Sequence, residues 1–363
     1  MNYDEFKQEL KEGLTDKLKH DYDSVYVIPK KAKKVNQELD SFMILTNGKR
    51  MLPTIYPERV YDRYQEIYDD IYRKGLPDNP MEIVIDETYD FIRESIERIP
   101  EALSIDNIDP SRLPDNVTLK LINTEQNKEL LENVPHREFE DLSIIYSWTI
   151  GMESEGVYST IVTNDMAEGI GLSEEELYQR ACENTKRLFP TEIKSMADIV
   201  TDLMLREVMD CMAEDIKETI EGESMEDIKE DIIEDIMEEM DVDTPYPMYV
   251  ISNKEHYYGA VEMLFNENLD KVSEIFHDDL YILPSSTHEV IAVPVKDYDA
   301  EELAAMVEGI NMEQVALEER LSNQVYFYDS RERKLSVATD NPNKSIDFSN
   351  ESQKFDNRNE TAR

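Results

Sequence analysis

The sequence predicts an α+β fold made of two mixed helix-and-strand units with antiparallel hairpins, joined by an acidic helical segment. Apolar residues recur at helical spacing in several stretches, which is typical of amphipathic helices. Short runs rich in β-branched and aromatic residues, separated by turn residues, indicate strands and hairpins. Residues 196–243 contain 19 acidic and 3 basic residues, which sets this segment apart from both units.

The chain has 363 residues, a length that fits about two domains. We expect an N-terminal α+β unit over 1–190, an acidic amphipathic segment over 191–245 and a C-terminal α+β unit over 246–338. Residues 339–363 are rich in Asn, Asp, Ser and Lys and poor in large apolar residues, so we expect a disordered tail.

The N-terminal unit is predicted to alternate helices and strands. We expect helices at 3–18, 60–71, 80–99 and 127–134, and strands at 24–28, 40–46 and 116–122. Asn79 would cap the third helix, with Pro80 in its first turn, where a missing N–H costs nothing.

A hairpin of 139–150 with 157–163 follows, because both segments are apolar and a glycine-bounded turn separates them. Ser173 and Glu176 match a capping box, which predicts a helix from there to about Leu188.

In the acidic segment, apolar residues keep a spacing of three or four on both sides of Gly222, which predicts two amphipathic helices. Their methionines would form an adaptable contact surface for a partner, or would pack on the protein itself. These are Met204, Met209, Met212, Met225, Met237 and Met240.

The C-terminal unit is predicted to contain strands at 248–252, 279–283, 289–295, 324–329 and 334–338, the last two forming a hairpin. Helices are expected at 254–265, 269–276 and 300–312.

Net charge and the polar N-terminus set expectations for location and partners. Lys and Arg number 38 and Asp and Glu 82, giving a net charge of −44, which disfavours direct binding to nucleic acids or membranes. We expect a protein partner, for which a basic surface would fit. Two cysteines, Cys182 and Cys211, and no signal-like or membrane-spanning stretch lead us to expect a cytoplasmic protein.

Cofactor and metal signals are weak. Gly169-Ile-Gly171 precedes a helix but lacks the third glycine of a dinucleotide fingerprint, and Glu174–Glu176 would repel a pyrophosphate. The histidines and cysteines do not show metal-ligand spacing. We therefore expect neither a cofactor nor a bound metal.

One turn carries the residue types of a hydrolytic site. Ser285, Ser286, His288 and Glu289 lie between two predicted strands, and a nucleophile, a base and an orienting carboxylate need these types. Sequence neighbours rarely reach triad geometry, so we interpret the segment first as a structural turn.

Two other clusters stand out. Lys30, Lys31, Lys33 and Lys34 form the one basic cluster, which we interpret as offsetting nearby acids. Tyrosines recur along one predicted helix, either as a half-buried face or as a protein-contact surface. They are Tyr56, Tyr61, Tyr64, Tyr68 and Tyr72.

Several blocks resemble a bacterial family known only as a domain of unknown function. They are 123–136, Phe139-Glu-Asp-Leu142, Met248-Tyr-Val-Ile-Ser-Asn253 and 280–290, and the similarity covers about 1–338. The acidic stretch 210–243 is longer than the resemblance leads us to expect, consistent with an insertion. The resemblance implies no activity or catalytic residue, but it directs attention to His136 and to the Ser285–Glu289 turn.

The leading functional hypothesis is a non-enzymatic binding or regulatory protein that acts through its acidic surface, because no complete catalytic motif is present. One alternative is a hydrolase that uses His288 with Ser285 or Ser286. Another is a nucleic-acid mimic, whose carboxylates at 214–243 would occupy a basic DNA-binding protein.

Overall fold

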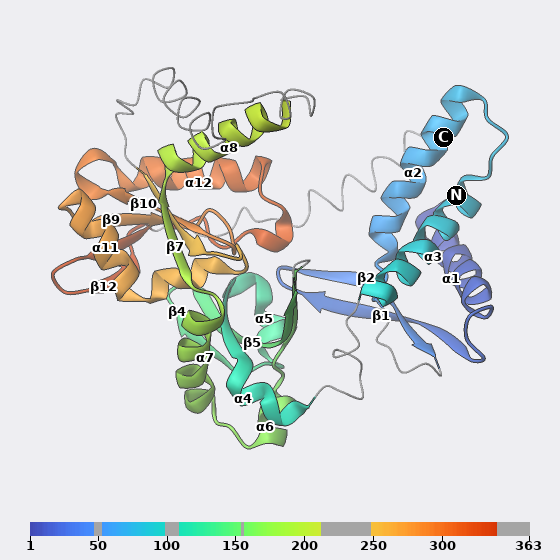
Figure 1. Cartoon of the computed structure of the whole chain (residues 1–363), viewed down its shortest axis with the longest axis horizontal. Coiled ribbons are helices and arrows are strands. Elements are labelled where there is room, and N and C mark those ends of the chain that lie inside the picture. The colour runs from blue at the N-terminus through green and yellow to red at the C-terminus, as the bar shows by residue number, and fades with distance from the viewer. Residues whose placement is uncertain (47–52, 99–108, 154–155, 212–247, 340–363) are drawn as a thin grey trace, which may run out of the picture.

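The computed structural model describes residues 1–46, 53–98, 109–153, 156–211 and 248–339, and only the backbone of Arg98, Glu153 and 205–211. The expected α+β fold is confirmed: helices alternate with antiparallel sheets (Figure 1). No helix in these ranges is long and apolar enough to cross a membrane.

Three helices and a long hairpin form the N-terminal part. These elements are α1 (Tyr3–Leu18), β1 (Val25–Lys34), β2 (Gln37–Thr46), α2 (Pro57–Lys74) and α3 (Pro80–Arg98). The apolar stripe of α1, predicted from its spacing, is fully buried against α2, α3 and one face of the hairpin. Asn79 accepts a hydrogen bond from the Met81 N–H at the start of α3, as expected of an N-cap.

The tyrosines of α2 form a face that changes from buried to exposed along the helix. Tyr61 and Tyr64 pack on Phe6 inside the core. Tyr68 and Tyr72 continue the row of rings outward and are 48% and 80% exposed. The prediction of a half-buried face therefore holds for the first half of the helix.

The second part begins with a four-stranded antiparallel sheet, which we call the middle sheet. Its strands are β3 (Val117–Asn123), β4 (His136–Phe139), β5 (Leu142–Glu153) and β6 (Gly156–Ile161), with β5 paired to the other three. Short helices α4 (Leu113–Asn116), α5 (Lys128–Leu131) and α6 (Asn164–Ile170) lie around it. The longer helix α7 (Glu174–Leu188) begins at the capping box of Ser173 and Glu176, as predicted.

A six-stranded antiparallel sheet, the C-terminal sheet, has the order β12-β11-β9-β10-β8-β7. Its strands are β7 (Thr191–Ser195), β8 (Tyr249–Asn253), β9 (Leu280–Leu283), β10 (Val290–Pro294), β11 (Tyr326–Asp329) and β12 (Lys334–Val337). The helices of this part are α8 (Met196–Cys211), α11 (Asn266–Phe276) and α12 (Ala300–Glu313). Residues of α12 pack on one face of the sheet, and the other face joins the main core.

The main core crosses the boundary that the sequence suggested at residue 190. One continuous cluster of buried residues runs from Leu113 to Tyr328 and includes both the middle and the C-terminal sheets. In addition, β7 lies in the predicted acidic segment but pairs with β8 as an edge strand. The larger division among the described residues therefore falls between 1–98 and 109–339.

Three local expectations differ from the structure. Residues 254–265 form a loop and the 3₁₀ helix η5 (Gly259–Leu264) instead of an α-helix. The short strand β4 ends at Phe139, so the next strand starts later than predicted. Thr339, placed in the predicted tail, is buried, and its hydroxyl bonds to Val325 and Gln324. The remaining tail and residues 212–247 lie outside the described residues.

The tip of the β1–β2 hairpin joins the two parts. Asn36 is fully buried there, with a positive φ of 61° that closes the turn. Its side-chain amide donates to the main-chain oxygens of Leu317 at 2.9 Å and Arg320 at 2.7 Å, and its own N–H donates to the side chain of Asn127 at 2.8 Å. Val35 beside it packs against the outer face of the middle sheet.

Candidate functional site

A cleft of about 220 Å³ lies between the hairpin tip, the start of α2 and the body of the protein. We call it the hairpin cleft. The N-terminal part contributes Lys34, Val35, Gln37, Leu39, Tyr56 and Arg59, and the body contributes Tyr258, Thr287, His288, Glu318 and Glu319. Because both parts line it, the cleft exists only when the hairpin tip is docked.

The charged side chains of the cleft wall do not all form ion pairs. Arg59 holds Glu318 at 2.8 Å, and the Nε2 atom of His288 lies 3.7 Å from Glu319. Lys34 lies over the ring of Tyr56 at 5.2 Å and has no carboxylate within ion-pairing distance among the described residues. Lys34 is therefore a cation available to an anionic ligand. Glu318 is paired with Arg59, whereas the contact of Glu319 with His288 is an ion pair only when the imidazole is protonated.

Lys120 lies behind this wall, buried in β3 and only 5% exposed. Its Nζ donates to the hydroxyl of Tyr257 at 3.0 Å and lies 3.8 Å from the ring centre of Tyr258. Burial, with a smaller contribution from the charge of Lys34, lowers the pKa of Lys120 to about 7. Sequence reasoning missed this residue; the available signal was one lysine inside the apolar run Val117–Ile122.

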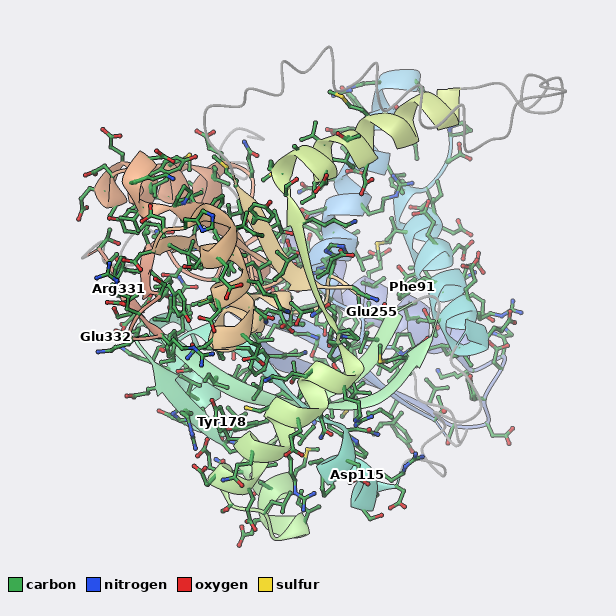
Figure 2. The ribbon with its side chains drawn as sticks, turned by 60° about the vertical axis from the view of Figure 1, so that its left-hand side comes forward. Phe91, Asp115, Tyr178, Glu255, Arg331 and Glu332 are labelled. Carbon is green, nitrogen blue, oxygen red and sulfur yellow. The ribbon has the colours of Figure 1, made fainter. Side chains whose placement is uncertain are left out.

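The loop after β8 supplies both tyrosines in a constrained conformation. His256 and Tyr258 adopt positive φ angles of 47° and 49°, which is unusual for residues other than glycine. Asn253 fixes the loop through two hydrogen bonds with the main chain of Tyr257. Such strain persists only where the surroundings hold it, and it is concentrated at functional sites. Figure 2 marks this loop by Glu255.

The predicted hydrolytic residues are close in space but are not arranged as a catalytic set. The Ser286 hydroxyl accepts from the main-chain N–H of His288 at 3.0 Å. The Nδ1 atom of His288 instead faces the His256 carbonyl at 2.9 Å and the Tyr258 N–H at 3.3 Å. No hydrogen bond joins Ser285, Ser286 or Glu289 to the imidazole in this described turn. His288 thus positions the tyrosine loop.

The other residues singled out from the sequence have mixed outcomes. Lys31 pairs with Asp40 at 2.9 Å and Lys33 with Glu129 at 3.0 Å, so the basic cluster offsets acids in part. Lys34 does not fit that interpretation, because it has no carboxylate partner among the described residues. His136, half-buried at the start of β4, bonds through Nδ1 to the Val134 carbonyl and lies away from the cleft lining.

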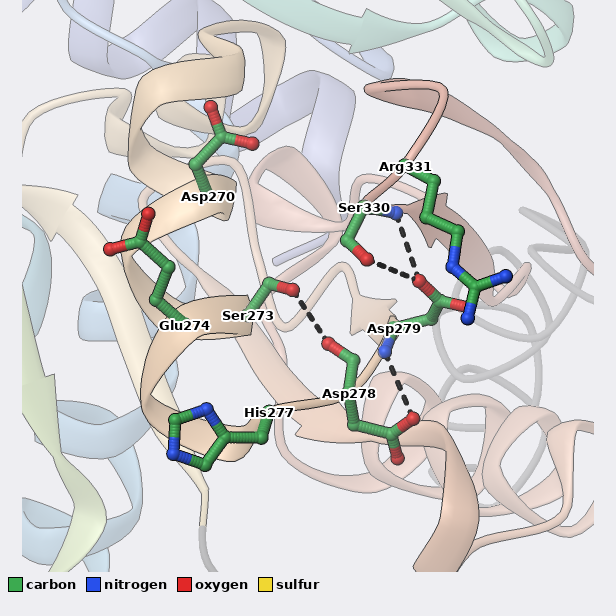
Figure 3. Close-up of a pocket in the computed structure, with 8 residues that line it drawn as sticks. All are labelled: Asp270, Ser273, Glu274, His277, Asp278, Asp279, Ser330 and Arg331. Carbon is green, nitrogen blue, oxygen red and sulfur yellow. Dashed lines mark hydrogen bonds between the residues drawn. The ribbon is translucent and has the colours of Figure 1, made fainter.

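A second hollow, of about 410 Å³, lies beside α11 and is lined mainly by polar residues (Figure 3). Its aspartates already have partners: Asp279 accepts from both the N–H and the hydroxyl of Ser330, Asp278 accepts from the Lys296 N–H, and Asp270 pairs with Arg333 at 2.6 Å. Across the described ranges, no three His, Cys, Asp or Glu side chains are arranged to hold a metal.

The acidic-surface hypothesis depends mainly on residues 212–243, which lie outside the described part of the chain. The preceding helix α8 lies within the described part. It exposes Leu203 and Met204 at 53% and 40%. The contact surface and the nucleic-acid mimic therefore remain predictions.

Fold and site together define an α+β protein with two parts. An N-terminal part of three helices and a β-hairpin meets a two-sheet body at a cleft lined by aromatic and cationic side chains. The model of the Family of unknown function (DUF5688) matches residues 3–330. The chain belongs to this family, as the sequence blocks suggested. No curated protein and no solved structure shows significant similarity to the chain.

Proposed function

We propose that this protein is a ligand-binding protein whose hairpin cleft takes a small organic anion with an apolar or aromatic part. The observation that carries this proposal is the presence of Lys34 in the cleft without a carboxylate partner among the described residues, in a chain of net charge −44. With so many carboxylates available, an unpaired cation beside aromatic walls favours an external anion.

The aromatic walls indicate the rest of the ligand. Tyr56 and Tyr258 each present a ring to the cleft, and flat rings favour apolar or aromatic groups between them. Gln37 and Thr287 add neutral hydrogen-bonding groups. The lining thus mixes apolar and aromatic side chains with polar and charged ones, and small-molecule sites use such polar groups to fix the orientation of a ligand.

Benzoate is a suitable probe because it combines a carboxylate with a ring. We expect isothermal titration calorimetry at pH 7 to give saturable benzoate binding to the full-length protein. Lys34→Ala should weaken it about tenfold, since a hydrogen bond to a charged group contributes about 1.5 kcal/mol or more.

Lys30→Ala is the matched control, because Lys30 is exposed on the same strand, four residues earlier, and does not line the cleft. The affinity of Lys30→Ala for benzoate should equal that of the unmodified protein. Equal losses in both variants, or no saturable heat with the unmodified protein, would overturn the proposal.

A further inference from the structure

The proposed binding of a ligand by Lys34 does not explain why the amine of Lys120 is buried. Every second residue of β3 faces the main core. Lys120 lies on the opposite side of the strand together with Ile122, and this side is under the docked hairpin tip. In a sheet that is buried on both faces, an apolar residue would be the ordinary choice here.

The surroundings of this amine lack a neutralising anion. Its contacts are the Tyr257 hydroxyl and the rings of Tyr257 and Tyr258, at 4.9 and 3.8 Å. No carboxylate lies within ion-pairing distance of its Nζ among the described residues. A lysine that is desolvated next to another cation is a reactive amine, because its neutral form is populated near neutral pH.

Groups that can move a proton stand next to it. The Tyr257 hydroxyl, which accepts from Lys120, also lies 2.5 Å from the hydroxyl of Ser159 on β6. Burial raises the pKa of Tyr257, so this hydroxyl stays protonated and can pass a proton to or from Ser159. The relay ends on a residue that is only half-buried.

We propose that Lys120 is a covalent attachment site for an oxo acid, which it binds reversibly as an imine. This inference rests on the proposed function, because Lys34 would hold the carboxylate of the same ligand in the hairpin cleft. Tyr258 both lines that cleft and covers Nζ, so rotation of its ring is the movement that admits the carbonyl group.

The reaction balances without an added oxidant or reductant. The lone pair of the neutral Lys120 amine attacks the carbonyl carbon, and a proton moves from nitrogen to oxygen through the Tyr257 hydroxyl. The resulting carbinolamine loses its hydroxyl group as water while nitrogen gives up its second proton. A carbon–nitrogen double bond forms, and addition of water reverses the sequence.

The test uses pyruvate as the probe, with sodium cyanoborohydride to reduce any imine to a stable secondary amine. Peptide mapping by mass spectrometry of the full-length protein at pH 7.0 should find the carboxyethyl adduct mainly on Lys120, at about tenfold or more the extent on exposed Lys30. Acetone, which has a methyl group in place of the carboxylate, should label Lys120 at least about tenfold less.

The pH dependence separates a reactive amine from accidental labelling. In this pH series the imine is trapped with sodium borohydride, which also reduces the neutral imine. Labelling of Lys120 should level off above about pH 8, while labelling of Lys30 should keep rising to about pH 10, because an exposed lysine loses its proton only there. Pyruvate adducts spread evenly over the surface lysines, or absent from Lys120, would overturn the inference.

The benzoate titration distinguishes this failure from failure of the proposed function. If benzoate binds in a Lys34-dependent manner and Lys120 stays unlabelled, the covalent step is wrong and the binding site stands. If benzoate shows no saturable binding and Lys120 is unlabelled, both are wrong. No folded variant of Lys120 is needed for either result, since the mapping uses the unmodified chain.

Discussion

The Nζ atom of Lys120 lies 3.8 Å from the centre of the Tyr258 ring, so a buried lysine is covered by an aromatic face instead of a carboxylate. A cation over a ring gains about 2 kcal/mol when both are desolvated. That gain is smaller than the cost of burying an ammonium group. Burial of Lys120 therefore costs least when its amine is neutral, which makes the stability of the protein depend on pH.

Lys120→Met should stabilise the protein at pH 6. The folded-state pKa of Lys120 is about 7, against an ordinary 10.5, so the unfolded chain binds the proton more tightly. The resulting penalty is complete below pH 7 and disappears as the pH approaches 10.5. Urea denaturation should show a gain of about 2–4 kcal/mol at pH 6 and a much smaller one at pH 9.5.

Lys30→Met controls for the loss of a lysine, because Lys30 is exposed. Its free energy of unfolding should differ little from that of the unmodified protein at either pH. A Lys120→Met protein that is less stable than the unmodified protein at both pH values would contradict the explanation.

Glu262 should give the opposite pH dependence. This fully buried carboxyl accepts from Thr191 at 2.6 Å and Asn268 at 2.8 Å, while its Oε1 has no hydrogen-bond partner among the described residues. Burial raises its pKa from 4.5 to about 7. The stability it provides is present below pH 4.5 and is lost as the pH rises through 7.

Glu262→Gln should therefore be about 1–3 kcal/mol more stable than the unmodified protein at pH 8.5 and similar to it at pH 5. Glu267→Gln is the control, since its exposed carboxylate pairs with Lys186. Thermal melts at the two pH values measure the difference. A stability gain for Glu262→Gln that is equal at both would rule out titration of Glu262 as the cause.

Gly259 is required where the tyrosine loop meets the sheet. A Cβ there would lie 2.3 Å from the Ser252 Oγ and 2.5 Å from the His288 main-chain oxygen. Gly259→Ala should lower stability by about 1–3 kcal/mol or more. Gly169→Ala, inside α6 with open space around it, should raise stability by about 0.5–1 kcal/mol in the same chemical denaturation assay. Equal effects of the two substitutions on stability would contradict the close approach of Gly259 to Ser252 and His288.

Asn36 should control docking of the hairpin. Asn36→Gly keeps the positive φ but loses the amide bonds to Leu317 and Arg320, so we expect a loss of about 2 kcal/mol. Asn36→Ala should lose about 1 kcal/mol more, because a Cβ is strained at this φ. Urea denaturation gives the energies, and hydrogen exchange at the hairpin tip should rise in both. Unchanged exchange at the tip would show that other contacts hold the hairpin.

Local patterns in the sequence were sufficient for most elements and insufficient for the site. The spacing of Phe6, Leu10 and Leu14 gave α1 its buried face, and the pair Ser173 and Glu176 fixed the start of α7. Both depend on neighbours within one or two turns of helix. The edge strand β7 was missed, since its pairing with β8 joins residues more than fifty positions apart.

Short-range hydrogen bonds and apolar periodicity were enough to predict the class of fold, the ends of α1 and α7, and the turn in which Ser286 accepts from the main chain. Only the tertiary structure brought Lys34, Lys120, Tyr258 and His288 together. They come from segments distant in the chain, and burial, which decides whether a lysine is a solvated charge or a reactive amine, is a property of the packed molecule.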